Sequence, residues 1–263
     1  MTKRSRRGRS KSSNTGIWIM LAIFIGWYWF SSDDKSSVTP PHSASTPSTT
    51  KPAMIWPPPL TDASVAADLG VRNYYVILDG SGSMSDDACK GAGSKIQQSR
   101  AALKAFADAV PQQANLGLEV FDSRGIRELI PLGTGNRAQF VNGVNSVSPA
   151  GGTPLSDAIA MGRRVLEAQA ARQLGYGEYH LVIVTDGVAD LHQNPTGAVD
   201  DMLSATPIVL HTIGFCLSTS HALNQPGRTI YKTAHDTREL AKGLEEVLAE
   251  SPDFTSTNFE VVQ

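Results

Sequence analysis

The stretch that decides the fold is YYVILDGSGSM, residues 74–84. Its first five residues are aromatic or aliphatic without a polar interruption, which is typical of a strand buried on both faces of a parallel sheet. The polar segment DGSGS follows at once, from Asp79 to Ser83. Because ligands of open parallel sheets bind where the strands end, this segment lies at the expected ligand edge.

Apolar runs of strand length alternate with helical patterns along the rest of the chain. Strands are predicted over residues 116–121, 126–132, 181–185, 208–214 and 229–232, and helices over residues 95–110, 137–147, 155–174, 197–203 and 238–250. A turn at residues 122–125 joins two of the strands into a predicted hairpin. We therefore expect one α/β domain over residues 71–250, a doubly wound and mostly parallel sheet with helices on both faces.

The N-terminal residues have a different composition. Residues 1–30 contain six basic and no acidic residues, and residues 17–30 form an uninterrupted apolar run with tryptophans near both ends. Extended over residues 14–32, this run reaches the length of a transmembrane helix, and the basic residues before it place the N-terminus in the cytoplasm. We expect a cytoplasmic tail over residues 1–13 and one transmembrane signal anchor over residues 14–32.

Residues 33–70 are expected to be a linker, and residues 251–263 a C-terminal tail. Ser, Thr and Pro make up 18 of residues 31–60, which is too polar a composition to bury a core. The domain is then membrane-anchored and extracytoplasmic, or periplasmic in a Gram-negative cell. A cleaved signal peptide is the alternative, although the nearest small residues suited to cleavage, residues 43–45, lie well beyond the apolar run.

The charge balance argues against a nucleic-acid partner. Residues 31–263 carry 17 basic and 25 acidic residues, a net charge of −8. Such a domain would repel a phosphate backbone.

Oxygen donors recur at the ends of predicted elements. Asp79, Ser81 and Ser83 lie in DGSGS, Thr153 lies in GGTPL before a predicted helix, and Asp186 follows a predicted strand in VTDG. Two carboxylates and three hydroxyls, without His or Cys, suit a small hard cation. We expect Mg²⁺, with Mn²⁺ or Ca²⁺ as alternatives, and donor side chains that face a cation on the solvent side and not the core.

This pattern resembles the metal-ion-dependent adhesion site of von Willebrand factor type A domains, which is written D-x-S-x-S, then T, then D. All three parts occur in order, and the resemblance covers about residues 70–250. It implies that the serines bind the metal directly, that the aspartates act largely through water, and that an Asp or Glu of a protein partner completes the metal shell. The implied function is metal-dependent protein binding without catalysis.

Two other functions stay open. The chain could be a structural subunit of an envelope assembly whose metal only holds loops together. It could also be a metal-dependent hydrolase, which needs a general base, and Asp190 and Glu119 are weak candidates for that role. The sequence contains no G-x-S-x-G motif and no phosphate-binding loop.

The two cysteines both follow predicted strands. Cys89 lies ten residues after Asp79, and Cys216 lies two residues after the strand that ends at Gly214. In the family that the chain resembles, these strands end at the same edge of the sheet. We expect a Cys89–Cys216 disulfide in an exported domain, with two separate thiols as the alternative.

Other polar residues receive ordinary structural interpretations. His180 and His211 lie in or beside predicted strands and are expected to be core or edge groups. Asp86, Asp87 and Asp190 are expected to be solvated acids in loops near the site.

Overall fold

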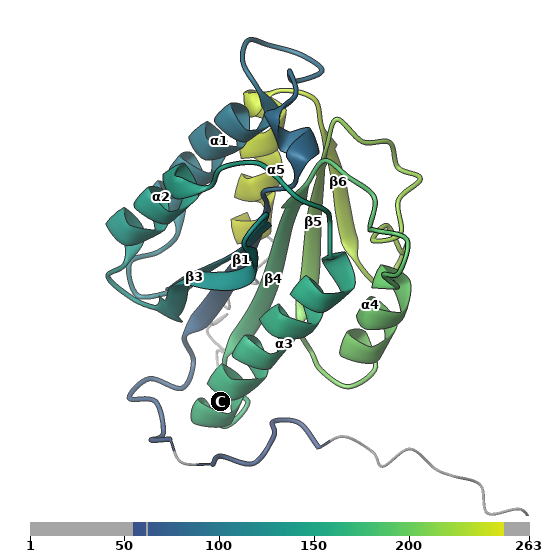
Figure 1. Ribbon diagram of the computed structural model, residues 1–263. Coiled ribbons are helices and arrows are strands. Elements are labelled where there is room, and N and C mark those ends of the chain that lie inside the picture. The colour runs from purple at the N-terminus through teal and green to yellow at the C-terminus, as the bar shows by residue number, and fades with distance from the viewer. Residues whose placement is uncertain (1–54, 62, 250–263) are drawn as a thin grey trace, which may run out of the picture. The chain divides into compact units, whose positions relative to one another are not determined.

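The computed structural model describes residues 55–61 and 63–249. Its centre is a six-stranded sheet in the order β3-β2-β1-β4-β5-β6 (Figure 1). The strands are β1 (Arg72–Asp79), β2 (Asn115–Asp122), β3 (Gly125–Gly133), β4 (Glu178–Thr185), β5 (Val209–Phe215) and β6 (Ile230–Ala234). Neighbouring strands are parallel except β2 and β3, which form the predicted hairpin.

Helices cover both faces of the sheet (Figure 1). One face packs against α1 (Lys95–Ala109), α2 (Arg137–Ser146) and α5 (Thr237–Ala249), and the other against α3 (Leu155–Arg172) and α4 (Pro195–Leu203). Side chains alternate along β1, so that Tyr74 and Val76 join the first core while Tyr75 and Ile77 join the second. Burial on both faces explains why β1 reads as an unbroken apolar run.

The predicted elements are found within a few residues of their expected bounds. The sequence pattern missed η1 (Gly82–Ser85), a short 3₁₀ helix inside the polar segment. Its backbone bonds join residues three apart, from Met84 N–H to the Ser81 carbonyl and from Asp86 N–H to the Ser83 carbonyl. A single turn of this kind in a Gly- and Ser-rich segment has no apolar periodicity from which it could be predicted.

The strand order determines which chain segments meet at each end of the sheet. β1 lies between β2 and β4, and β5 follows β4. We call the end where the parallel strands finish the carboxyl edge, and the end where they begin the amino edge. The segments after Asp79, Thr185 and Phe215 therefore all start at the carboxyl edge.

The segment before β1 lies along the amino edge (Figure 1). In the described part of residues 55–71 before β1 there is no helix or strand. The Trp56 and Tyr179 rings pack edge to face with centroids 5.4 Å apart, and the Ala66 amide donates to the Arg172 carbonyl at 2.8 Å. This end of the expected linker is therefore held against the domain.

The remaining N- and C-terminal expectations lie outside the described residues. They are the tail over residues 1–13, the anchor over residues 14–32, the linker as far as residue 54, and the tail over residues 251–263. Within residues 55–61 and 63–249, every helix is too short or too polar to cross a bilayer.

Candidate metal centre

The turn after β1 is held close to the rest of the carboxyl edge. The Gly80 amide donates to the Phe121 carbonyl at 2.8 Å, and the Gly80 carbonyl accepts from Ala150 at 2.9 Å. A Cβ at Gly80 would lie 2.8 Å from both the Phe121 oxygen and a Val147 methyl group, so this approach requires glycine. The turn therefore directs the side chains of Asp79, Ser81 and Ser83 into a fixed space.

Asp79, the last residue of β1, is completely buried. Its Oδ1 accepts the Ser81 amide at 2.8 Å, and its Oδ2 accepts the Thr185 hydroxyl at 2.6 Å. The pKa of Asp79 is raised to about 6, because burial and the nearby Asp186 charge raise it more than the hydrogen bonds from Ser81 and Thr185 lower it. The carboxyl group is thus oriented by hydrogen-bond donors, but its burial away from water disfavours the charged form.

The two serines connect Asp79 with Asp186 across the edge. The Ser81 and Ser83 hydroxyl oxygens lie 3.1 Å apart, and the Ser83 hydroxyl donates to Asp186 Oδ1 at 2.8 Å. Asp186 follows β4, the strand beside β1. Four of the five expected donors are therefore linked through hydrogen bonds of the site.

Thr153 reaches the same space from the loop before α3. A Cβ built on Gly187 would lie 3.4 Å from the Thr153 hydroxyl and 3.9 Å from the Ser83 hydroxyl, so both hydroxyls face one point. Asp190 holds Thr153 there, because its Oδ2 accepts the Thr153 amide at 3.0 Å and its own amide donates to the Thr153 carbonyl at 3.1 Å. The structure thus brings together all five residues predicted from the sequence.

The structure adds detail to two sequence-based expectations about this site. Asp190 is exposed, as expected of a loop acid, and it also positions Thr153. The donors were expected to face a cation on the solvent side of the site, and Asp79 is 0% and Thr153 only 7% exposed. Both details arise because the loops at the carboxyl edge fold over the strand ends, which sequence periodicity does not describe.

Lys95 and Thr185 are the residues in contact with the donors that the sequence patterns did not indicate, and Thr185 donates its hydroxyl to Asp79. Lys95 pairs with Asp186. Its Nζ lies 2.7 Å from Asp186 Oδ2 and donates to the Ser83 carbonyl at 3.2 Å. The side chain is 14% exposed, so this ion pair is largely shielded from water. Lys95 begins α1, and an antiparallel bridge between Asp87 and Ser94 brings the chain back to the site.

The charges of the site leave a demand for a cation. Among the described residues, Lys95 forms an ion pair with Asp186 and not with Asp79. Asp79 is therefore a buried carboxylate without a positive partner in this part of the chain, which is an unfavourable arrangement. Two carboxylates and three hydroxyls around one point suit Mg²⁺, Mn²⁺ or Ca²⁺, so the residues present fit a hard divalent cation.

The acids considered as general bases have other positions. Glu119 lies within β2, and its pKa is raised to about 8, because burial and the charge of Glu128 raise it more than Arg164 lowers it. Asp190 is engaged with the Thr153 backbone.

Cys89 and Cys216 form a disulfide, with Cα atoms 5.7 Å apart. Cys89 lies in the segment between η1 and α1, and Cys216 lies directly after β5. The bond therefore ties the segment that precedes Lys95 to the end of β5. The alternative of two separate thiols is not what the structure shows.

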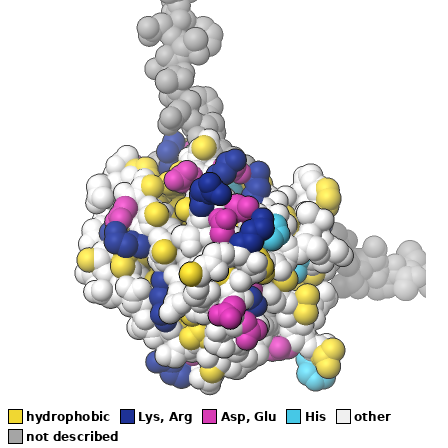
Figure 2. Space-filling model, turned by 90° about the horizontal axis from the view of Figure 1, so that it is seen from above, with side chains coloured by type: hydrophobic (Ala, Val, Ile, Leu, Met, Phe, Trp, Pro, Cys, Tyr) yellow, Lys and Arg dark blue, Asp and Glu magenta, His cyan; other side chains and the backbone are white. Residues whose placement is uncertain are grey.

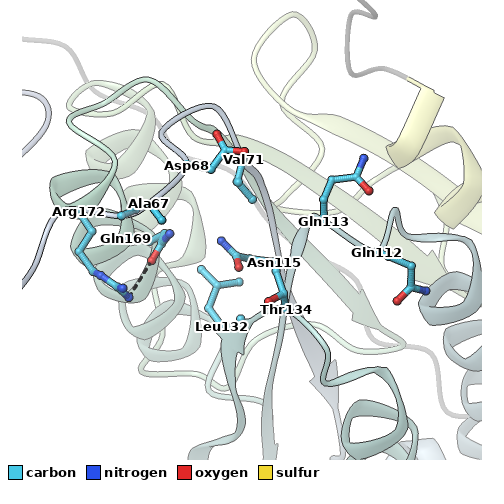
Figure 3. Close-up of a pocket in the computed structure, with 12 residues that line it drawn as sticks. Ala67, Asp68, Val71, Gln112, Gln113, Asn115, Leu132, Thr134, Gln169 and Arg172 are labelled. Carbon is cyan, nitrogen blue, oxygen red and sulfur yellow. Dashed lines mark hydrogen bonds between the residues drawn. The ribbon is translucent and has the colours of Figure 1, made fainter.

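A hollow of 530 Å³ lies at the amino edge, away from the site (Figure 3). Amide side chains account for much of its lining, those of Gln112, Gln113, Asn115 and Gln169. The part of the chain that the structure describes contains no cluster of three or more His, Cys, Asp or Glu residues placed to hold a metal. The hydroxyl-rich carboxyl edge is therefore the candidate metal centre.

Comparison with known proteins places this geometry in a family. The model of the von Willebrand factor type A domain matches residues 74–188, which include all five donors. The chain is 28% identical over 157 residues to the uncharacterized protein YwmD of Bacillus subtilis, a match that covers 54% of this chain and 67% of that protein.

Solved structures share the fold. An aerotolerance-related membrane protein from Bacteroides fragilis superposes with a TM-score of 0.53 at 18% identity, covering 67% of this chain and 98% of that one. The manganese-loaded TRAP protein of Plasmodium vivax gives a TM-score of 0.53 at 20% identity, covering 67% and 73%. At these identities the likeness shows the fold alone. The family match therefore shows a von Willebrand factor type A domain over residues 74–188 of this chain, and the solved structures share its fold.

Proposed function

We propose that this chain is a membrane-anchored binding protein whose von Willebrand factor type A domain holds a protein partner through a divalent cation. Asp79, Ser81, Ser83, Thr153 and Asp186 hold the cation, and an Asp or Glu of the partner completes its shell. The anchor is the apolar segment over residues 14–32, which places the domain outside the cytoplasm. The chain acts by binding and not by catalysis.

The observation that carries this proposal is the charge imbalance at the carboxyl edge. Asp79 is buried with only hydrogen-bond donors beside it, while Lys95 pairs with Asp186. A divalent cation supplies the missing positive charge, and its excess charge attracts an acidic side chain from outside. Lys95 keeps Asp186 in place on the other side of the site.

The comparisons support the cation and the anchor in a general way. The TRAP structure contains manganese, which is one of the three ions that the donor set suits. The Bacteroides fragilis neighbour is described as a membrane protein. We favour Mg²⁺ because the site supplies only two carboxylates and leaves positions for water and for one partner ligand.

The experiment is capture of partners from the native membrane. The full-length chain, kept in mild detergent, is immobilised and exposed to a membrane extract of its own cells in Mg²⁺ or in EDTA. Proteins that are retained in Mg²⁺ should fall at least tenfold in EDTA and with Ser83→Ala. Ser85→Ala is the matched control, because the Ser85 hydroxyl donates to the Gly82 carbonyl and is not part of the donor set.

Two outcomes would contradict the proposal. Equal retention by wild type and Ser83→Ala would show that partners do not bind through the cation. Loss of the melting transition of the free protein in EDTA would show that the cation holds the fold together, as in the structural alternative.

A further inference from the structure

The turn between β2 and β3 carries two arginines at the carboxyl edge. Arg124 lies in the turn with its side chain 59% exposed, and Arg127 lies near the start of β3 with its side chain 24% exposed. Both form ion pairs with Asp122, the last residue of β2, whose side chain is 1% exposed. Two guanidinium groups against one carboxylate leave this turn with an excess of positive charge.

The two arginines contact Asp122 in different ways. Arg127 binds it with two nitrogens, since Nη1 donates to Oδ1 at 2.6 Å and Nη2 donates to Oδ2 at 2.8 Å. Arg124 uses one guanidinium nitrogen, which lies 3.0 Å from Oδ2. The hydrogen bonds from Arg127 and Arg124 hold the pKa of Asp122 well below its usual range, so this carboxylate stays charged and keeps Arg127 engaged. Arg124 is therefore the arginine whose exposed guanidinium group can bind a further carboxylate.

The β2–β3 turn packs against the loops that carry the metal donors. Gly80 lies within DGSGS, and Gly151 begins GGTPL. A Cβ built on Gly80 would lie 3.2 Å from Asp122 Cβ. A Cβ built on Gly151 would lie 3.0 Å from the Ser123 amide nitrogen. Because the turn approaches both loops this closely, it is fixed at the rim of the candidate metal centre.

Acidic side chains are exposed on two other sides of the centre. After η1, Asp86 and Asp87 are exposed. Lys95 compensates part of this charge, because it lies 3.8 Å from Asp86, but its closer partner is Asp186 at 2.7 Å. In the loop between β4 and α4, Asp190 is exposed. An acidic group that approaches the centre from either of these sides meets like charge.

Charged side chains of both signs lie together on the carboxyl edge, and apolar side chains are scattered between them (Figure 2). Lys90 pairs with Glu239 at 3.8 Å, and Asp157 is exposed in the first turn of α3. The β2–β3 turn is therefore the side of the centre that favours a negatively charged group. A membrane surface or a nucleic acid would also lie over the acidic sides and be repelled, whereas a narrow protein segment can enter along the turn alone.

We propose that Arg124 binds a second acidic side chain of the protein partner, so that the partner segment carries two Asp or Glu residues. One acid completes the shell of the cation, and the other pairs with the Arg124 guanidinium group at the β2–β3 turn. This inference rests on the proposed function for the first acid and adds the second acid as a requirement for specificity. Without the cation, the contact with Arg124 alone is a weak, solvent-exposed ion pair.

The test is selection from a random dodecapeptide library displayed on phage, with the full-length chain in mild detergent and Mg²⁺ as the target. Wild type should enrich peptides that contain two acids, and EDTA should abolish their retention. Arg124→Gln should still enrich one acid but lose the preference for the second, because Arg127 continues to hold Asp122 and the turn. Arg124→Glu should instead enrich Lys or Arg in place of the second acid. The best wild-type peptide should bind Arg124→Gln about fivefold more weakly.

Arg228→Gln is the matched control, since Arg228 is also exposed and paired with an acid, Asp200, but lies just before β6, which begins at the amino edge. It should select the same peptides as wild type. Loss of the second acid in this control as well would trace the preference to net charge and overturn the inference.

A second acid that persists in Arg124→Gln, or wild-type peptides with a single acid, would overturn the inference and leave the proposed function standing. Two-acid peptides that depend on Arg124 but ignore EDTA would support the arginine contact and overturn the role of the cation. Failure to enrich acidic peptides would overturn both.

Discussion

The two edges of the sheet both bury polar side chains, but they satisfy them differently. At the amino edge, Asn73 donates to the Val71 and Glu178 carbonyls and to Gln173 Oε1, and it accepts from Asn115. At the carboxyl edge, Asp79 and Asp186 accept from Ser81, Ser83 and Thr185. Amides carry donors and acceptors together, whereas carboxylates only accept.

This difference distinguishes a structural network from a binding site. The amides of the amino edge pair with one another and carry no net charge, so the network is complete within the chain. The carboxyl edge gathers two negative charges, one lysine and hydroxyl oxygens that still have lone pairs to offer. Its unmet need is for a positive charge, which is what the proposed function supplies.

The largest expected effect on stability is that of removing the Cys89–Cys216 disulfide at the carboxyl edge. Cys89→Ser should lower the free energy of unfolding by about 4 kcal/mol, because the bond joins residues 127 apart in sequence and restricts the unfolded chain. Cys216→Ser and the double variant should show the same loss, since each removes the same bond. Urea unfolding of the three variants and of wild type measures it, and an unchanged midpoint in the double variant would contradict it.

Asn73→Ala tests the amino edge. It should lower the free energy of unfolding by about 3 kcal/mol, because it leaves Gln173 and two backbone carbonyls without their buried donor. The affinity for Mg²⁺ should not change. Asn142→Ala, at an exposed position of α2, is the control and should change stability by less than about 0.5 kcal/mol.

Urea unfolding and Mg²⁺ titration of the same Asn73→Ala preparation give the two results. A loss of Mg²⁺ affinity without a loss of stability would reverse the roles assigned to the two edges.

Lys95→Met distinguishes the effect of the lysine charge from the effect of the cation. Without its ammonium group, the metal-free protein should lose about 1 kcal/mol of stability, because Asp186 becomes an unpaired, shielded carboxylate. The same change should tighten Mg²⁺ binding by about fivefold, because a competing positive charge has gone. Urea unfolding in EDTA and calorimetric titration measure these opposite changes.

Lys104→Met is the control for Lys95→Met, since Lys104 forms an exposed pair with Asp108 on α1 and should affect neither quantity. Weaker Mg²⁺ binding by Lys95→Met would show that the lysine supports the cation and does not compete with it.

What the sequence could predict depends on whether an effect is local. The strand over residues 74–78 is predictable because burial on both faces produces an apolar run, and the five donors are predictable because each lies at the end of an element. The roles of Lys95, Thr185 and Asp190 depend on contacts with residues 91, 106 and 37 positions away. Spacing along the chain does not show that a lysine which begins a helix folds back toward a strand end.

A separate expected effect is a pH dependence near the start of β4 and β5. Burial, together with the charge of His180, lowers the pKa of His211 to about 3, and the ring nitrogens of the two histidines lie 3.1 Å apart. As pH falls from 7.5 to 5.5, the unfolded chain binds a proton at this histidine that the folded protein does not. Stability should therefore fall by about 1.4 kcal/mol through this residue.

His211→Gln should remove that part of the pH dependence, as measured by urea unfolding in EDTA at the two pH values. His192→Gln, at an exposed position, should retain it. Parallel pH dependences in wild type and His211→Gln would show that this histidine is not buried in its neutral form.

We infer that the carboxyl edge lacks one positive charge and that Asp79 is the group that needs it. Calorimetric titration of Mg²⁺ into the full-length chain and into its Asp79→Asn variant tests this directly. We expect one saturable site in wild type and at least a 100-fold weaker affinity in the variant. The stability of the variant in EDTA should be unchanged or higher, because a buried carboxyl becomes a neutral amide. Equal Mg²⁺ affinities, or no saturable binding by wild type, would contradict it.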